Sequence, residues 1–438
     1  MPAKLTNPSR RQFLKIGGAA SAALGFPYLV PGTVLGKDGA VAPSERIVMG
    51  GIGLGGRGTG VLKWMLSSNQ MQFVAICDVR KQRRQSIKKM VDGHFKNKDC
   101  KMYPDLREFL QARSDIDAML IATGDRWHAP AAMLAMMAGK DVYCEKPGTM
   151  TIAEGRELVK VAKTFGRIFQ TGTQRLSETK FVQPTEMARN GRLGKLQTVR
   201  AHLWPRVKDV THNKWLPAQP EPKKEDVDWD LWLGPVPWRP YNKAYLGGCG
   251  AWGVYWDLAA GIAGWGSHTI AQCQMAASME LSSPVKYTYP GNSSGDGLVA
   301  EYPNGVKLAM HFSQGWRGTC GVRFEGTEGW ASVADGYARP DVSSPKLLET
   351  YQKDIKDYTE RTRRELNHVM DFFSCVRSRR QTIANPEVMH RSMSTNHIIN
   401  ICLKLKRDLE WNPEKEEFVN DPEANRLRSR AVRYPGRV

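Results

Sequence analysis

Short apolar runs and helical patterns alternate through the N-terminal part of the chain. The runs typical of buried strands are 46–52, 72–77, 116–122, 142–144 and 168–172. The spacing of apolar residues predicts helices over 59–67, 81–91, 130–138 and 153–164. Because strands that alternate with helices form parallel sheets covered on both faces, we predict a doubly wound α/β domain here.

The pattern changes beyond this region. Residues 205–250 are rich in Pro, Trp and Gly and predict a long loop on a second domain, a length that usually marks a functional loop. Strand-like runs follow at 285–289, 298–302, 306–312 and 321–325, and the tripeptide Pro303-Asn304-Gly305 predicts a hairpin turn. A helical pattern over 269–277 precedes these runs, and helical patterns at 363–377 and 386–409 complete the chain. We therefore predict a second α/β domain with a largely antiparallel sheet.

The N-terminal segment has the features of a targeting signal rather than of a folded domain. Residues 9–15, Ser-Arg-Arg-Gln-Phe-Leu-Lys, have the form of a twin-arginine export signal, and a weakly apolar stretch follows over 16–35. Two prolines and the short apolar length argue against a stable membrane span. Pro43 follows the small-residue motif 40–42 and disfavours cleavage there, so upstream cleavage and retention as an anchor both stay open. A basic tail is the alternative interpretation. We expect export, to the periplasm or beyond.

Composition and charge limit the classes of molecule that we expect the protein to bind. The 438 residues are 41% hydrophobic and 24% charged, which is typical of a soluble two-domain protein. The formal charge of +19 indicates a solvated basic surface or affinity for an anionic glycan. No motif for nucleic acid occurs, and an exported protein rarely meets one. The eight cysteines lack C-x-x-C or zinc spacing, so we expect free core thiols, with a disulfide framework as the alternative, and no metal site.

A glycine motif stands between the first strand and the first helix. Gly53, Gly55 and Gly58 form G-x-G-x-x-G, which lets the backbone approach a diphosphate at a helix N-terminus. Asp78 ends the second strand, 20 residues after Gly58, where a carboxylate accepts hydrogen bonds from the ribose hydroxyls. The pattern predicts a Rossmann domain that prefers NAD to NADP, a preference that the nearby Arg80 weakens.

Two further motifs follow strands of the same sheet. The segment Thr123–His128 follows the strand that ends at Ala122, beside the nicotinamide half of the cofactor. His128 is either a ligand of that half or a helix-cap or core histidine. Glu145-Lys146-Pro147 follows the strand 141–144 and places a lysine at the carboxyl edge of the sheet, where ligands bind. A catalytic role for Lys146 is thus indicated.

Together these motifs resemble those of the Gfo/Idh/MocA oxidoreductases, particularly an exported bacterial branch. The segments 172–175 and 324–329 also resemble that branch, and the similarity runs from about Arg46 to the C-terminus. The resemblance implies a Rossmann domain, an α/β domain with an open sheet that often forms homo-oligomers, and redox chemistry on a sugar or polyol. We divide the chain into a signal segment (1–42), an NAD-binding Rossmann domain (43–170) and a substrate and oligomerisation domain with returning C-terminal helices (171–438).

The resemblance also implies site residues. Lys146 matches the lysine that contacts the reacting hydroxyl, and His268, opening a helix over 269–277, matches the acid/base histidine. Many members have an aspartate where this chain has Gly264, and Asp257 and Tyr255 are the candidates to replace it. The residues expected to contact NAD are Gly53, Gly55, Gly56, Arg57, Gly58, Asp78, Thr123, Asp125, Trp127, His128, Glu145 and Lys146.

The distribution of the tryptophans indicates the kind of substrate. Eight of the 13 lie between Trp204 and Trp265, and their flat faces suit sugar rings, although most are expected only to hold the long loop in place. We expect the substrate to contact Arg175, Asp257 and Trp265. The leading hypothesis is an exported dehydrogenase of a sugar, glycoside or polyol that keeps NAD bound. The alternatives are a glycoside hydrolase that uses NAD transiently and a non-catalytic sugar-binding protein.

Overall fold

A six-stranded parallel sheet forms the N-terminal part of the computed structural model, which describes residues 45–203, 213–292, 294–313, 316 and 318–433. Its strands are β1 (Ile47–Ile52), β2 (Met71–Cys77), β3 (Lys101–Tyr103), β4 (Ala118–Ile121), β5 (Asp141–Cys144) and β6 (Phe169–Thr171). They are ordered β3-β2-β1-β4-β5-β6, so the strand order reverses between β1 and β4. That reversal is where open α/β sheets bind ligands. The predicted doubly wound domain is confirmed.

Helices cover this sheet, and three of them begin one to five residues earlier than predicted. They are α2 (Gly56–Leu66), α3 (Lys81–Phe95), α4 (Leu106–Ala112), α5 (Asp125–Met137) and α6 (Ile152–Thr164). The helix predicted over 130–138 is α5, which begins five residues earlier, after the N-cap Gly124, and holds Pro130 inside it. The five predicted strands agree with the structure within one or two residues, whereas β3 and α4 were not predicted.

The second sheet has nine strands and is mixed. Its strands are β7 (Leu196–His202), β8 (Lys286–Thr288), β9 (Val299–Glu301), β10 (Lys307–His311), β11 (Thr319–Gly326), β12 (Trp330–Asp335), β13 (Asp341–Val342), β14 (Leu409–Asn412) and β15 (Glu417–Phe418). All its pairs are antiparallel except β7 with β10. The hairpin predicted at 303–305 joins β9 to β10. A largely antiparallel open sheet is thus confirmed.

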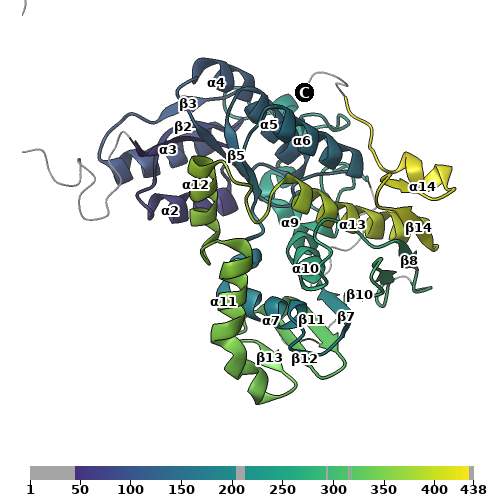
Figure 1. The fold of residues 1–438 in the computed structure, drawn as a ribbon. Coiled ribbons are helices and arrows are strands. Elements are labelled where there is room, and N and C mark those ends of the chain that lie inside the picture. Colours follow the sequence, from purple (N-terminus) through teal and green to yellow (C-terminus); the bar gives the residue numbers. More distant parts are fainter. Residues whose placement is uncertain (1–44, 204–212, 293, 314–315, 317, 434–438) are drawn as a thin grey trace, which may run out of the picture. The chain divides into compact units, whose positions relative to one another are not determined.

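The C-terminal helices return to the first sheet (Figure 1). Phe372 and Phe373 of α12 (His368–Ser378) belong to the core on one face of that sheet, and Met389 of α13 (Pro386–Leu405) belongs to the core on the other. The predicted helix over 363–377 was wrong at its start, because α11 (Tyr351–Thr362) ends there with Arg363 left-handed. The helix predicted to reach 409 stops at Leu405, before β14 begins.

The segment predicted as a plain loop contains short helices and its own core. These are α8 (Trp229–Leu233), η5 (Lys243–Gly247) and α9 (Cys249–Trp252). Buried aromatic residues hold them together: Trp229, Trp232, Tyr241, Tyr245, Trp252 and Tyr255. We call residues 213–252 the cover. The prediction placed this segment on the second domain, but it also hydrogen-bonds to the first, because Lys81 N–H donates to Asp226 and Asp228 N–H donates to Val79.

Candidate active site

The glycine turn after β1 has the geometry of a diphosphate site. Gly53 has a φ of +68°, and a Cβ there would lie 2.3 Å from Thr123 Cγ2, so only glycine fits. A Cβ on Gly58 would lie 2.7 Å from Ala122, which explains the close packing of α2 on the sheet. Side chains on Gly55 or Gly56 would meet nothing within 4 Å. Open space therefore lies before the N–H groups that begin α2, where an anion is stabilised.

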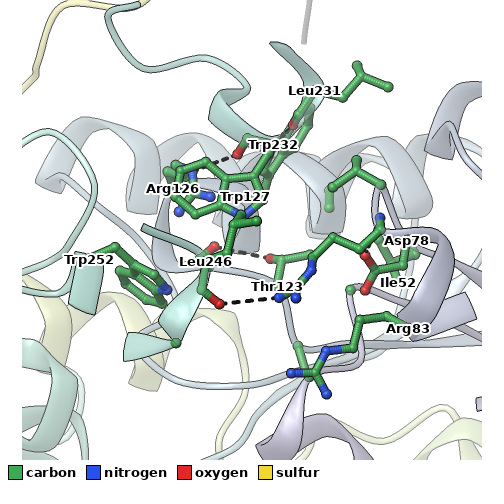
Figure 2. A pocket seen from close by; sticks show the side chains of 18 of the residues that line it. Ile52, Asp78, Arg83, Thr123, Arg126, Trp127, Leu231, Trp232, Leu246 and Trp252 are labelled. Carbon is green, nitrogen blue, oxygen red and sulfur yellow. Dashed lines mark hydrogen bonds between the residues drawn. The ribbon is translucent and has the colours of Figure 1, made fainter. Parts of the chain in front are cut away.

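A cavity of about 530 Å³ extends from this turn along the carboxyl edge of the sheet. Figure 2 shows side chains from two sides of it: Ile52, Asp78 and Thr123 from the sheet edge, and Trp232 and Leu246 from the cover. The cavity is large enough for an extended ligand to lie between the two walls. The cofactor-binding residues predicted from the glycine turn, from Asp78 and from Thr123 are thus brought together.

Asp78 is buried at the end of β2 and lines this cavity. Its Oδ1 accepts a hydrogen bond from Arg80 N at 2.8 Å. Burial raises the pKa of the Asp78 carboxyl to about 6, against the opposing effect of the Arg80 backbone and charge. The Arg80 guanidinium donates to Leu246 O at 3.2 Å and so joins the cover to the ribose end of the cavity. The carboxylate is thus well placed to accept hydrogen bonds from ribose hydroxyls.

Glu145 fixes the end of β5 beside the glycine turn. Its buried Oε1 accepts hydrogen bonds from Gln174 Nε2 at 2.8 Å and from Arg57 Nε at 3.2 Å. Gly172 makes room for this carboxylate, because a Cβ there would lie 2.6 Å from Oε1. Glu145 therefore ties the first turn of α2 to the strand that carries Lys146.

Lys146 reaches from this edge to the second domain. Its Nζ donates a hydrogen bond to Gly264 O at 2.5 Å and lies 4.8 Å from the centroid of the Trp265 ring. Gly264 and Trp265 belong to the first turn of α10 (Ala263–Ala276). Trp265 is 41% exposed, which makes its ring available to a ligand. The structure thus brings together Lys146 and Trp265, two residues predicted separately.

His268 lies in the second turn of α10 and does not open a helix, so that prediction was wrong. Its side chain is buried, and its ring centroid lies 6.2 Å from that of Trp265. Among the described residues, no group forms a hydrogen bond with its buried Nδ1. Burial lowers the pKa of His268 well below its usual value, and the positive charges of Arg175 and Lys146 add to this. The imidazole is therefore neutral at neutral pH and able to accept a proton.

Other predicted site residues have structural partners. Arg175 is buried, forms an ion pair with Asp335 at 2.7 Å and donates to Cys320 O at 2.5 Å. Asp257 forms an ion pair with the buried Arg239 at 3.4 Å. Within the described ranges, the polar contacts of the Asp257 side chain and backbone are with Arg239 and Asn213, so a role for Asp257 in place of the aspartate stays a prediction.

The segment Thr123–His128 divides between the cavity and the core. Trp127 lines the cavity, and its Nε1 donates to Leu231 O of the cover at 2.8 Å. Asp125 is buried and accepts from Ala260 N at 3.0 Å, just before α10. His128 is buried with its Nδ1 2.7 Å from Pro147 O, in the arrangement expected of a core histidine. Neither Asp125 nor His128 lines the cavity.

Sequence reasoning missed the residues that close the cavity. Arg126 lies inside the predicted motif but was not singled out, and Trp232, Leu246 and Trp252 come from the cover. The tryptophan-rich composition of 205–250 marked the segment as functional without indicating which residues face the cofactor. Trp204 lies outside the described residues. All eight cysteines are free thiols, and all but Cys249 are buried.

Within the described part of the chain, no group of three or more His, Cys, Asp or Glu side chains is placed to hold a metal ion. None of the helices in that part is both long and apolar enough to span a membrane.

Two sequence profiles of one family cover most of the chain. The profile of the oxidoreductase family's NAD-binding Rossmann fold matches residues 46–173, and that of its C-terminal alpha/beta domain matches residues 207–438. The chain belongs to the Gfo/Idh/MocA oxidoreductase family. The predicted cofactor NAD is thereby confirmed. A twin-arginine signal profile matches residues 7–27, which confirms export by that pathway; this segment lies outside the described residues.

Curated relatives of this Gfo/Idh/MocA protein carry names of glycoside hydrolases. A glycosyl hydrolase family 109 protein of Saccharopolyspora erythraea is 32% identical over 36% of this chain and 38% of its own length. One from Stenotrophomonas maltophilia is 27% identical over 52% of this chain and 48% of its own. An alpha-N-acetylgalactosaminidase of Shewanella oneidensis is 32% identical over 36% of this chain and 37% of its own. The chain thus matches less than half the length of each.

Solved structures of similar fold include sugar dehydrogenases. The WlbA dehydrogenase of Chromobacterium violaceum, in complex with NADH and UDP-GlcNAcA, has a TM-score of 0.57 at 14% identity over 84% of this chain and 96% of its own. The aldose-aldose oxidoreductase of Caulobacter crescentus has a TM-score of 0.55 at 14% identity over 83% and 99%. At these identities the likeness shows the fold alone.

Proposed function

We propose that this protein is an exported oxidoreductase that moves a hydride between NAD and a hydroxyl-bearing carbon of a sugar, glycoside or polyol. One observation carries the proposal: Lys146 Nζ lies 4.8 Å from the centroid of the Trp265 ring, the centroid of the His268 ring lies 6.2 Å from it, and Trp265 is 41% exposed. An ammonium group, a neutral imidazole and an exposed indole face are the groups that alcohol oxidation on a sugar ring needs.

Each side chain has a defined task. Oxidation of an alcohol removes a proton from oxygen and a hydride from carbon. His268 takes the proton, because its lowered pKa keeps the imidazole neutral. Lys146 stabilises the negative charge that develops on the substrate oxygen. Trp265 supplies a flat face for the sugar ring. NAD, when bound, accepts the hydride and returns it in the reverse direction.

Retention of NAD is part of the proposal. The cover is joined to the Rossmann domain by hydrogen bonds from Arg80, Arg126 and Trp127 to carbonyl oxygens of Leu246, Trp232 and Leu231, in that order. Release of a dinucleotide would require these bonds to break. A protein exported in its folded state carries such a cofactor with it, and a retained cofactor must be regenerated in place.

Glycoside hydrolysis is a second candidate, favoured by the names of the curated relatives. In that route the sugar is first oxidised to a ketone. The ketone acidifies the adjacent C–H, so a weak base removes that proton and the aglycone leaves. Water then adds, and the hydride returns to the carbonyl carbon. The sequence consumes water and glycoside without net oxidation, as a retained cofactor requires.

We also propose a homo-oligomer formed through the nine-stranded sheet. Its strands carry a polar cavity of about 400 Å³, lined by residues that include Arg200, Arg323 and Trp330. Light scattering on the purified protein checks this: a monomeric mass at micromolar concentration would contradict it.

Nitrophenyl glycosides, offered to the purified protein without added NAD, separate the functions. Release of nitrophenol without accumulation of NADH supports hydrolysis. Accumulation of NADH up to one equivalent of protein supports the dehydrogenase. If NAD is bound but neither signal appears across neutral and anionic glycosides and free sugars, the protein is a non-catalytic binder and the proposal fails.

A further inference from the structure

Arg126 is a buried cation at the wall of the cofactor cavity. It is the second residue of α5, it is 3% exposed, and it lines the cavity. Its Nε donates to Trp232 O at 2.9 Å, and its guanidinium carbon lies 3.7 Å from the centroid of the Trp232 ring (Figure 2). Among the described residues, no group accepts a hydrogen bond from its buried Nη1. One edge of the guanidinium thus holds the cover, while Nη1 has no acceptor in the part of the chain that the structure describes.

The described residues supply no direct counter-ion for the charge of Arg126. No ion pair joins Arg126 to a carboxylate within the described ranges, and the carboxylate of its neighbour Asp125 accepts from Ala260 N instead. Burial lowers the pKa of Arg126 to about 9, against the attraction of Asp125, and the positive charge of Arg239 lowers it further. Burying an unpaired charge is strongly unfavourable, so such groups occur where a partner or ligand completes them.

The same cavity presents a second group suited to an anion. The N-terminus of α2 opens into it through Gly55 and Gly56, whose added side chains would meet nothing within 4 Å. Arg126 follows β4, the strand next to β1 at the reversal of strand order, so both groups lie at the switch point of the sheet. Gly124 allows this approach, because a Cβ there would lie 2.4 Å from Arg126 Nη1.

We propose that Arg126 binds the diphosphate of NAD and thereby couples cofactor binding to closure of the cover. The guanidinium contacts the cover through Trp232 and, at 5.7 Å, the Trp252 ring. With the diphosphate present, the charge is neutralised and the closed cover is stable. Without it, closure buries an uncompensated cation, so the cover opens more often. The coupling is reciprocal, since whatever holds the cover closed also slows release of NAD. The inference rests on the proposed retention of NAD.

The direct test is the rate at which NAD leaves the purified holoprotein, followed by exchange with labelled NAD. Arg126→Gln keeps a planar donor but removes the charge, and release is expected to become about 10- to 100-fold faster, the range for loss of a hydrogen bond to a charged group. Arg167→Gln is the matched control, because Arg167 is also a partly buried arginine that donates to backbone carbonyls, Phe165 O and Gly139 O, but it does not line the cavity. Its release rate is expected within about threefold of the native rate.

An unchanged release rate in folded Arg126→Gln protein would overturn the assignment. Equal acceleration in both variants would also overturn it, because the effect would then reflect charge in general. Hydrogen exchange on the native protein tests the coupling without any variant. Amides of 229–252 are expected to exchange faster after NAD is stripped, and equal exchange with and without NAD would refute the coupling. Neither readout uses turnover, so a failure here is distinct from a failure of the proposed catalytic function.

Discussion

The ammonium group of Lys146 donates a hydrogen bond to the backbone carbonyl oxygen of Gly264, 2.5 Å away. The bond joins the edge of the NAD-binding sheet to the helix that carries His268. The family resemblance implies an aspartate in many members at the position of Gly264, which has no side chain. Without a carboxylate at that position, the positive charges around His268 are less compensated.

Gly264→Asp is predicted to raise the pKa of His268. A side chain fits, because a Cβ at Gly264 meets nothing within 4 Å. A carboxylate there favours the protonated imidazole, against the burial and positive charges that now lower its pKa. The acid limb of the profile of kcat/KM against pH should therefore move to higher pH. Gly264→Asn has the same shape without the charge, and an equal shift in that variant would contradict the electrostatic account.

Lys146→Met and His268→Gln are each predicted to lower kcat by about 10²- to 10⁴-fold, the range for loss of a general base or of a charge that stabilises the transition state. NAD content, measured after denaturation, should stay at the native level, because neither residue lines the cofactor cavity. Lys140→Met is the control. Lys140 also donates to backbone carbonyls, at Ser114 and Ile116, but it precedes β5 instead of following it. Near-native turnover in a catalytic variant would refute its role.

The sequence predicted the parallel domain well because its strands are continuous apolar runs with turn residues between them. It failed where backbone conformation departs from residue preference. Arg363 and Lys406 end helices in the left-handed region that glycine normally occupies, so no glycine marked these ends. The start of α10 was missed because Gly264 and Gly266 look like helix breakers. Gly266 is instead a packing residue, since a Cβ there would lie 1.9 Å from Asn396 Oδ1 of α13.

The site was predictable where motif and strand end coincide, as for the glycine turn, Asp78 and Lys146. The wall of the cavity that the cover forms could not be predicted from the sequence. The contacts of Trp232 and Leu246 with the sheet edge join segments distant along the chain, and the cover has no periodicity that indicates which side chains face inward. Arg126 could be recognised only once its burial and lack of a counter-ion were known.

Arg433→Ala is predicted to speed release of NAD by several-fold. Arg433 fastens the cover to the C-terminal segment, because its guanidinium donates to Gly234 O at 2.8 Å and pairs with Asp230 at 2.6 Å. Loss of charged hydrogen bonds at a partly exposed site is worth about 1 kcal/mol, which corresponds to a factor of about five. Arg428→Ala is the control, since Arg428 bonds to Glu416 O and Asn425 O instead of the cover. Equal release rates in the two variants would contradict this role.

Asp354→Asn is predicted to stabilise the protein above pH 6. Asp354 is fully buried, and its ion pair with Arg192, at 3.3 Å, leaves Oδ1 without a hydrogen bond among the described residues. Burial raises its pKa from 3.8 to about 6. Because the folded-state pKa lies above the unfolded value, the native protein loses stability as pH rises from about 4 to 6. Asparagine does not ionise, and Arg192 keeps its second partner, Asp357.

Urea titrations of the NAD-loaded protein measure this difference. The free energy of unfolding of Asp354→Asn, relative to the native protein, should rise between pH 4 and 6 and then stay about 1–3 kcal/mol higher. Glu360→Gln, an exposed substitution on the same helix, should stay within about 0.5 kcal/mol at every pH. If the curves of Asp354→Asn and the native protein run parallel between pH 4 and 8, the buried carboxylate does not ionise at a cost to the fold. The electrostatic account of the contact between Asp354 of α11 and Arg192, which follows α7 (Thr179–Arg189), is then wrong.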